Sequence, residues 1–197
     1  MTTSRLEAFS DGVIAILITI MVLELEPPHA ANFAALRPLL PVLGSYALSF
    51  VFLGIYWNNH HHLLHAAKKI NGKVLWANLH LLFWLSLIPL ATAWMGRAGA
   101  EPLPVAAYGA LQVLAAVAYI VLQTTLIAAQ GGPSQLAAAL GGDAKGKLSL
   151  LAYVSAVPLA FVRPWISIAI YVSVALAWLV PDKRIESRVA DDENSAS

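Results

Sequence analysis

The sequence predicts an all-α, polytopic membrane protein with six transmembrane helices. Apolar residues make up 59% of the 197 residues and charged residues only 12%, whereas a soluble domain carries about 25% charged residues. The mean hydropathy is +0.70, so a soluble core of this size could not bury the apolar surface. Cysteine is absent, which excludes disulfide frameworks, thiolate metal sites and cysteine nucleophiles.

Six apolar segments approach the length of a spanning helix, which needs about 20 mostly apolar residues. We expect them at residues 6–25, 39–64, 74–96, 103–129, 147–162 and 164–180. Pro38 and Pro41 suit the start of the second segment, and the last two segments are short for full spans. Together the six form one transmembrane domain, residues 1–181, followed by a polar tail at residues 182–197.

Two prolines fall inside the predicted helices. Pro89 lies in the third segment and Pro158 in the fifth. A proline within a helix removes a backbone hydrogen bond and is a common cause of kinks. We therefore expect both of these helices to bend.

The basic residues predict the orientation in the membrane. With the N-terminus placed inside, the inner segments carry nine Lys and Arg residues and the outer loops three. The outer three are Arg37, Arg97 and Arg163. Because cytoplasmic loops carry an excess of Lys and Arg, we expect both termini in the cytoplasm of a multi-pass protein of the cell membrane, most simply a bacterial plasma membrane.

The first helix differs from the other five because it carries acidic residues near both ends. Its uncharged stretch runs from residue 12 to residue 23, between Asp11 and Glu24. These residues span roughly 18 Å of helix, whereas the hydrocarbon core is about 30 Å thick. A lipid-facing helix would hold Asp11 or Glu24 at a costly depth, so we expect this helix at the centre of the protein or beside water.

The first helix also has one purely apolar face. At about 100° per residue, five side chains share that face. They are Phe9, Gly12, Ile16, Ile20 and Leu23. Ser10 and Asp11 point to the other side. Ordinary helix packing also produces an apolar stripe with a polar cap, so periodicity alone does not assign a function to this face.

A short motif opens the first helix. Arg5-x-x-x-Phe9-Ser10-Asp11 precedes the run of residues 12–16. It resembles the signature of the six-helix potassium channels of lysosomes and bacteria, whose first helix begins with Arg-x-x-x-Phe-Ser-Asp. The resemblance covers about the first 95 residues, and the later half is similar to the family only in hydropathy.

Further matches to that family lie in the second and third segments. A Trp-then-His cluster in the second segment comprises Trp57, Asn58, His60, His61 and His62. In the third segment, Trp76-x-Asn78 and Pro89-x-x-Thr92 are similar to the family pattern. We expect the cluster, with Trp76 and Asn78, to form a supporting polar network.

The resemblance implies a homotetramer in which the first helices line a central pore. The apolar constriction would then fall at Ile16, Ile20 and Leu23, on the face that periodicity identified, and Thr19 beside it would contribute a hydroxyl to selectivity. The resemblance also implies that the signature residues stay outside the narrow pore. Arg5, Ser10 and Asp11 would fix the base of the helix through contacts to the second and third helices.

A ring of four Ile16 side chains would gate by dewetting, because an ion cannot cross an apolar ring without its hydration shell. Potassium is larger than sodium and loses its water more cheaply, which gives a modest preference. The Thr-Val-Gly-Tyr-Gly filter of ordinary potassium channels is absent. We therefore expect a potassium-preferring cation channel with weaker selectivity than that of those channels.

The histidines offer two interpretations. His61 and His65 are four residues apart and could share a metal ion. No acidic ligands accompany them, and the five histidines in or next to the second and third segments are too few for a di-iron site. We therefore expect an interfacial polar cluster that pairs with Asp11 or with backbone, with no metal and no cofactor. A histidine beside Asp11 would make the conductance pH-sensitive.

Other function classes fit less well. A proton-coupled or pH-gated transporter is the alternative, but transporters usually carry paired repeats and broken helices, and no repeat is visible. No nucleophile–base pair is apparent, so we expect no enzyme. The net charge of +1 and the lack of a basic arm argue against a nucleic-acid partner. The expected partners are the bilayer, monovalent cations and further copies of the chain, and a purely structural membrane subunit stays possible.

Overall fold

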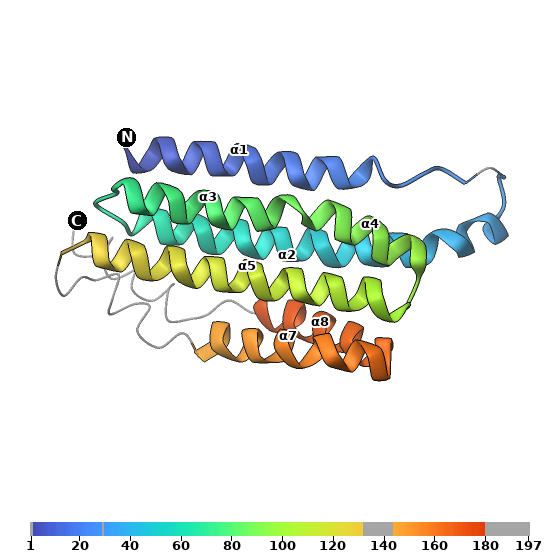
Figure 1. The fold of residues 1–197 in the computed structure, drawn as a ribbon. Helices are drawn as coiled ribbons and strands as arrows, with labels where there is room; N and C mark the ends of the chain where they lie inside the picture. Colours follow the sequence, from blue (N-terminus) through green and yellow to red (C-terminus); the bar gives the residue numbers. More distant parts are fainter. Residues whose placement is uncertain (1, 29, 132–143, 180–197) are drawn as a thin grey trace.

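The structure is a computed structural model that describes residues 2–28, 30–131 and 144–179. These residues form helices that lie side by side along one axis, without strands (Figure 1). The helices are α1 (Thr3–Val22), η1 (Phe33–Leu39), α2 (Leu40–His65), α3 (Gly72–Ser86), α4 (Ile88–Ala98), α5 (Pro102–Ala129), α7 (Ala144–Val162) and α8 (Pro164–Leu179). The all-α class predicted from the sequence is confirmed.

Among the described residues, four helical units are long and apolar enough to cross a membrane. They are Phe33–His65, Gly72–Ala98, Pro102–Ala129 and Ala144–Val162. The α8 helix is apolar but has only 16 residues, and α1 carries three charged side chains near its start. All six expected segments are therefore helical close to the predicted bounds, while the count of six crossings stays a prediction. The expected tail, residues 182–197, lies outside the described residues.

Proline positions explain the largest departures from the expected bounds. The third segment is interrupted at Leu87, and Pro89 lies in the first turn of the helix that follows, where its missing N–H costs nothing. In contrast, α7 continues through Pro158. An unexpected 3₁₀ helix, η1, precedes α2 and begins where the Asn32 side chain accepts a hydrogen bond of 3.0 Å from the Ala35 N–H.

The bundle places α1 on one side and the α7–α8 pair on the other (Figure 1). α1 packs against α2, α3 and α4, while α5 contacts α3, α4, α7 and α8. The start of α1, the turn between α2 and α3, the end of α5 and the start of α7 all lie at the same end of the bundle. This is the end that the basic residues predict to be cytoplasmic.

The second half of the chain packs around buried tyrosines. Tyr108 and Tyr171 are almost fully buried, and their rings lie 5.5 Å apart. The Tyr171 hydroxyl donates a hydrogen bond of 3.0 Å to the Val105 carbonyl and lies directly over Gly109, where a β-carbon would collide with it. A glycine at this position therefore lets α8 approach α5 closely.

Candidate functional site

The α1 helix has one buried face and one exposed face. The buried face consists of Leu6, Ser10, Ile14, Leu17 and Met21, which follow the three-to-four-residue spacing of a helix that packs on one side. These side chains face α2, α3 and α4, the neighbours of α1 in the bundle. The inner face therefore fixes how α1 is rotated against the rest of the chain.

The exposed face is the one that the sequence predicted to line a pore. Ile16 is 57% exposed, Ile20 43% and Leu23 79%, whereas Ile14 on the inner face is 1% exposed. Phe9 lies on the same outer side. Leu23 is the C-cap residue just past the end of α1. Of the three residues predicted to form the constriction, Ile16 and Ile20 therefore lie within the regular helix. This apolar face is left free for lipid or for another copy of the chain.

Thr19 lies beside the exposed apolar face. Its hydroxyl donates to the backbone of its own helix, 2.9 Å from the Ile16 carbonyl oxygen and 3.2 Å from that of Ala15. Since the hydroxyl hydrogen is directed at backbone, the oxygen lone pairs remain available. This is the orientation that a hydroxyl needs in order to contact a cation.

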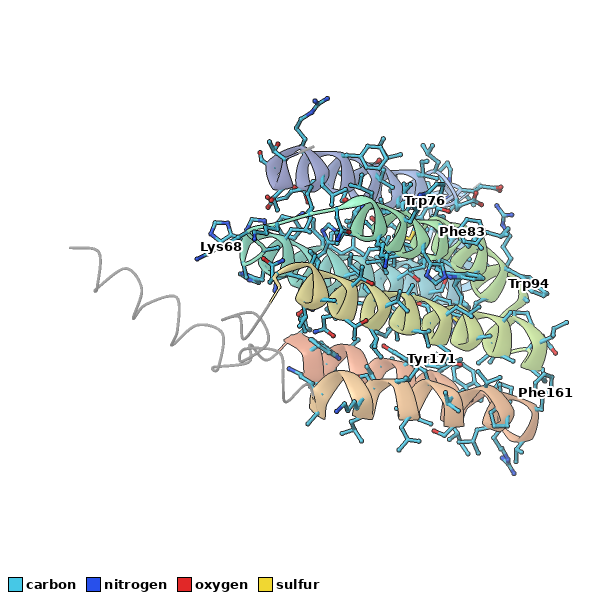
Figure 2. All side chains as sticks on the ribbon, turned by 60° about the vertical axis from the view of Figure 1, so that its left-hand side comes forward. Lys68, Trp76, Phe83, Trp94, Phe161 and Tyr171 are labelled. Carbon is cyan, nitrogen blue, oxygen red and sulfur yellow. The ribbon has the colours of Figure 1, made fainter. Side chains whose placement is uncertain are left out.

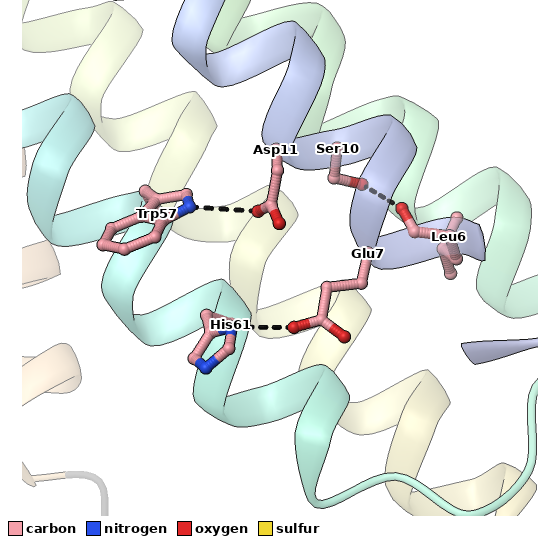
Figure 3. A network of polar contacts seen from close by, with 6 residues as sticks. All are labelled: Leu6, Glu7, Ser10, Asp11, Trp57 and His61. Carbon is pink, nitrogen blue, oxygen red and sulfur yellow. Dashed lines mark hydrogen bonds and ion pairs between the residues drawn. The ribbon is translucent and has the colours of Figure 1, made fainter. Parts of the chain in front are cut away.

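Two acidic side chains at the base of α1 contact α2 (Figure 3). The Trp57 Nε1–H donates a hydrogen bond of 3.0 Å to Asp11 Oδ1, and His61 Nδ1 lies 2.7 Å from Glu7 Oε1. Asp11 and Glu7 are one helical turn apart, as are Trp57 and His61. Because α1 and α2 run antiparallel, the pairs form two successive rungs between the helices.

The sequence predicted a histidine beside Asp11, and His60 lies close enough to interact with the Asp11 charge, but the described hydrogen bond of Asp11 goes to a different residue. The partner of Asp11 is Trp57, and the acidic partner of His61 is Glu7. The contact of Glu7 was not predicted, although its position one turn before Asp11 places both carboxylates on the same side of the helix. The register between α1 and α2 decides the pairing, and hydropathy does not encode that register.

A buried hydrogen-bonded chain joins α1 to α3 and α2. Ser10, His60 and Asn78 are each 0% exposed. The Ser10 hydroxyl donates to the Leu6 carbonyl oxygen at 2.9 Å, so Ser10 Oγ accepts from the Asn78 amide at 2.9 Å. The Asn78 amide oxygen can only accept, so His60 Nε2 donates to it at 2.7 Å. These bonds fix the rotation of α1 at its base.

The other predicted site residues lie outside this chain of contacts. Arg5, Asn58 and His62 are exposed, and the His62 ring contacts that of His61. Trp76 lies on the outer side of α3 and is 75% exposed (Figure 2). The structure thus brings together six of the residues that the sequence singled out. They are Ser10, Asp11, Trp57, His60, His61 and Asn78.

A second buried polar cluster, closer to the middle of the bundle, was missed by sequence reasoning. Thr92 Oγ1 lies 2.6 Å from Ser49 Oγ and 2.7 Å from the Ile88 carbonyl oxygen. Ser49 Oγ in turn lies 2.9 Å from the Tyr108 hydroxyl. The cluster links α4, α2 and α5, and its one signal in the sequence was the Pro89-x-x-Thr92 match.

The histidines were also candidates for a metal site. Within the parts of the chain that the structure describes, no three His, Cys, Asp or Glu side chains converge as metal ligands do. The His61 and His65 rings stack with their centroids 6.1 Å apart. The histidine rings near the end of α2 therefore form a stacked cluster.

Comparisons with known proteins match the first half of the chain to a family and nearly the whole chain to one relative. Residues 5–89 match the family described as "Endosomal/lysosomal potassium channel TMEM175". The protein named potassium channel HX13_20290 from Chryseobacterium sp. (strain P1-3) is 50% identical over 192 residues, which cover 98% of this chain and 100% of the relative. Potassium channel B446_29190 from Streptomyces collinus is 33% identical over 99 residues, 48% of each chain.

One solved structure shares the fold. It is described as the crystal structure of a lysosomal potassium-selective channel TMEM175 homolog from Chamaesiphon minutus. The TM-score is 0.79 at 23% sequence identity, over 90% of this chain and 96% of that one. The architecture of the described helices is therefore that of a solved channel.

Proposed function

The chain belongs to the TMEM175 family of potassium channels, and we propose that it is a potassium-preferring cation channel whose pore is lined by α1. The relatives named above are potassium channels, and the chain is a multi-pass membrane protein by its apolar helices. The observation that supports the position of the pore is the exposed face of α1, which carries Ile16, Thr19 and Ile20.

The charges at the base of α1 argue against a position in lipid. Glu7 and Asp11 lie within one turn of each other on the side of the helix that contacts α2. Ionisable side chains within a membrane segment almost always face a bundle interior or a water-filled path. A helix at the centre of an assembly satisfies this requirement, while its apolar face surrounds the axis.

We propose four copies around that axis. Ile16 and Ile20, one turn apart, would then form two successive apolar rings. Such rings hold back ions by dewetting, and widening or wetting of the rings would open the path. Thr19 would offer an oxygen between the rings to an ion that has lost part of its water.

The first test is ion selectivity. Purified protein is reconstituted into bilayers, and reversal potentials are measured under opposing potassium and sodium gradients. We expect discrete single-channel steps and a reversal potential that follows the potassium gradient. Saturable uptake that depends on a driving ion would instead favour the transporter alternative and contradict the proposal.

The second test concerns the pore face. Ile16→Asn places an amide in the proposed ring, so water enters more easily, and we expect potassium conductance to rise about tenfold or more, equivalent to about 1.4 kcal/mol off the barrier. The matched control is Val117→Asn on the outer surface of α5, which should leave conductance unchanged. Equal conductance for wild type and Ile16→Asn would contradict the proposal that α1 lines the pore.

The third test is the number of subunits. The mass of the purified protein in detergent, corrected for bound detergent by light scattering, should equal four chains of 21.1 kDa each. A monomer that still conducts would contradict a pore built at a fourfold axis.

A further inference from the structure

An open pocket lies at the predicted cytoplasmic end of the bundle, apart from the proposed pore face. Its volume is about 520 Å³, a size that suits a small ligand or a lipid headgroup. The pocket is formed by the start of α1, the loop between α2 and α3, and the end of α5. The lining side chains that matter for the argument are Thr2, Thr3, Lys68, Lys69 and Asn71.

The loop that carries the two lysines is braced from α5. The Gln130 side-chain oxygen accepts hydrogen bonds from the Lys68 and Lys69 backbone N–H groups at 3.1 and 3.2 Å. The Gln130 amide nitrogen donates to the Lys69 carbonyl at 3.1 Å. The loop backbone is thus held on three points, while both lysine side chains stay exposed.

Within the described residues, no negative charge neutralises the two lysines that line the pocket. No acidic side chain lines it, and neither Lys68 nor Lys69 forms an ion pair in the described ranges. Lysines at this end follow from the orientation rule alone. A braced loop that presents two unpaired lysines to a cavity goes beyond what that rule requires.

The start of α1 adds hydrogen-bond donors to the same pocket. Its N-cap, Thr2, has an extended backbone and makes no side-chain cap, so the first N–H groups of α1 lack the usual capping acceptor. The start of α3 differs, because Asn71 Oδ1 accepts from the Val74 N–H at 3.1 Å. Free N–H groups and the positive end of the helix dipole favour an anion.

We propose that this pocket binds the phosphate group of an anionic ligand, held by Lys68, Lys69 and the uncapped first turn of α1. The two lysines belong to the loop that joins two membrane-length units, Phe33–His65 and Gly72–Ala98, at the end of the bundle that the basic residues predict to be cytoplasmic. Anionic lipids concentrate in the cytoplasmic leaflet, and basic pockets between helices bind their headgroups. We therefore favour a lipid headgroup as the ligand that carries the phosphate. Free phosphate in solution would make the same contacts and is the other ligand to be tested.

Lipid retention is measured by native mass spectrometry of the full chain in detergent, with phosphatidylglycerol or phosphatidylcholine added. We expect selective retention of phosphatidylglycerol by the wild type. The K68Q/K69Q variant should bind it at least about fivefold more weakly, the factor that one lysine near an anionic surface contributes. K68R/K69R keeps the charge and should restore binding.

The control is K145Q/K147Q, which removes the same number of charges at the same end of the bundle. It should retain phosphatidylglycerol as the wild type does, and each variant is first checked for a monodisperse elution profile. A second arm measures inorganic phosphate binding by calorimetry without anionic lipid. Phosphate binding that K68Q/K69Q abolishes, without lipid retention, supports the pocket with a soluble source.

Equal retention of phosphatidylglycerol by the wild type and K68Q/K69Q, or no binding in either arm, would overturn the proposal. The proposal would also be overturned if K145Q/K147Q weakened lipid binding as much as K68Q/K69Q. The total positive charge at this end of the bundle, and not the pocket, would then explain the binding. Both binding measurements are made without measuring ion flux. If the protein did not conduct potassium, the result for the pocket would therefore still be valid.

Discussion

The two halves of the chain are held together by different kinds of contact. In α1 to α4, ionisable and amide side chains cross between helices, as in the Asp11–Trp57 and Glu7–His61 pairs. In α5 to α8, tyrosines pack against small residues, and hydroxyls donate to backbone carbonyls, as with Tyr171. Both halves bury apolar side chains, but the described inter-helix contacts of acidic side chains lie in the first half.

Under the proposed function, this difference separates the half that contains the pore-lining helix from the half that supports it. The family match at residues 5–89 covers α1 to α3 and the start of α4, which hold the Asp11–Trp57, Glu7–His61 and Ser10–Asn78–His60 contacts. Polar groups inside a membrane bundle are costly unless paired, so the paired acidic side chains of the first half call for a role beyond packing. In the second half, where Gln112, Gln123 and Ser167 are also buried, close approach of helices through small residues contributes to stability.

The largest effect on stability should come from removing the centre of the polar chain. Asn78→Ala leaves the buried His60 Nε2–H without an acceptor and opens a small cavity. We expect the free energy of unfolding to fall by about 2–4 kcal/mol. The measurement is unfolding in detergent followed by tryptophan fluorescence.

The matched control for that substitution is Asn59→Ala. Within the described residues, the Asn59 side chain donates to its own helix, to the Ile55 carbonyl at 2.8 Å, so its loss should cost less than about 1 kcal/mol. If the two variants unfold alike, the buried chain contributes nothing specific and the contrast between the halves fails.

The second effect tests the packed half. Gly109→Ala forces a β-carbon against the Tyr171 hydroxyl, and overpacking of this kind costs about 1–3 kcal/mol. Gly54→Ala in α2 is the control, because a β-carbon there meets no atom within 4 Å. Alanine favours helix over glycine by about 0.5–1 kcal/mol, so this control should stabilise the protein. Two variants of equal stability would contradict the close α5–α8 contact.

Much of this architecture could be predicted from the sequence. Hydropathy predicted all six helical segments, and a 3.6-residue period identified the exposed face of α1 that carries Ile16 and Ile20. These features depend on one helix at a time. Pro89 also marked the break between α3 and α4, because a missing N–H has a local effect.

Features that depend on two helices at once were harder to predict. The hydrogen bond between Trp57 and Asp11 was not predicted, since the axial register of α1 against α2 selects that pair. The Thr92–Ser49–Tyr108 cluster needs the rotation of three helices, which no pattern along one segment fixes. Trp76 matched the motif as well as Asn78 did, yet it faces outward, because neighbours two positions apart lie on different sides of a helix.

The third effect compares two tryptophans that the sequence grouped together. Trp57→Phe removes the donor to Asp11 but keeps an aromatic ring, and we expect a loss of about 0.5–1.5 kcal/mol. Trp76→Phe changes an exposed side chain and should alter stability by less than about 0.5 kcal/mol. Unfolding of both variants in the same detergent gives the comparison. A larger loss for Trp76→Phe would place the supporting network on the outer side of α3 instead.

The smallest effect concerns the far end of α1, where Glu24 pairs with Arg97 of α4. Both side chains are exposed, so the pair resembles a surface ion pair, which contributes about 0.2–1 kcal/mol. A double-mutant cycle with Glu24→Gln and Arg97→Gln isolates this coupling, and added salt should weaken it. At the base of α1, the Ser10–Asn78–His60 hydrogen bonds are buried, so these contacts should hold at the same salt concentration. A salt-resistant coupling above about 1 kcal/mol at Glu24 would mean that both ends anchor α1 equally, and the base would lose its special place within the first half.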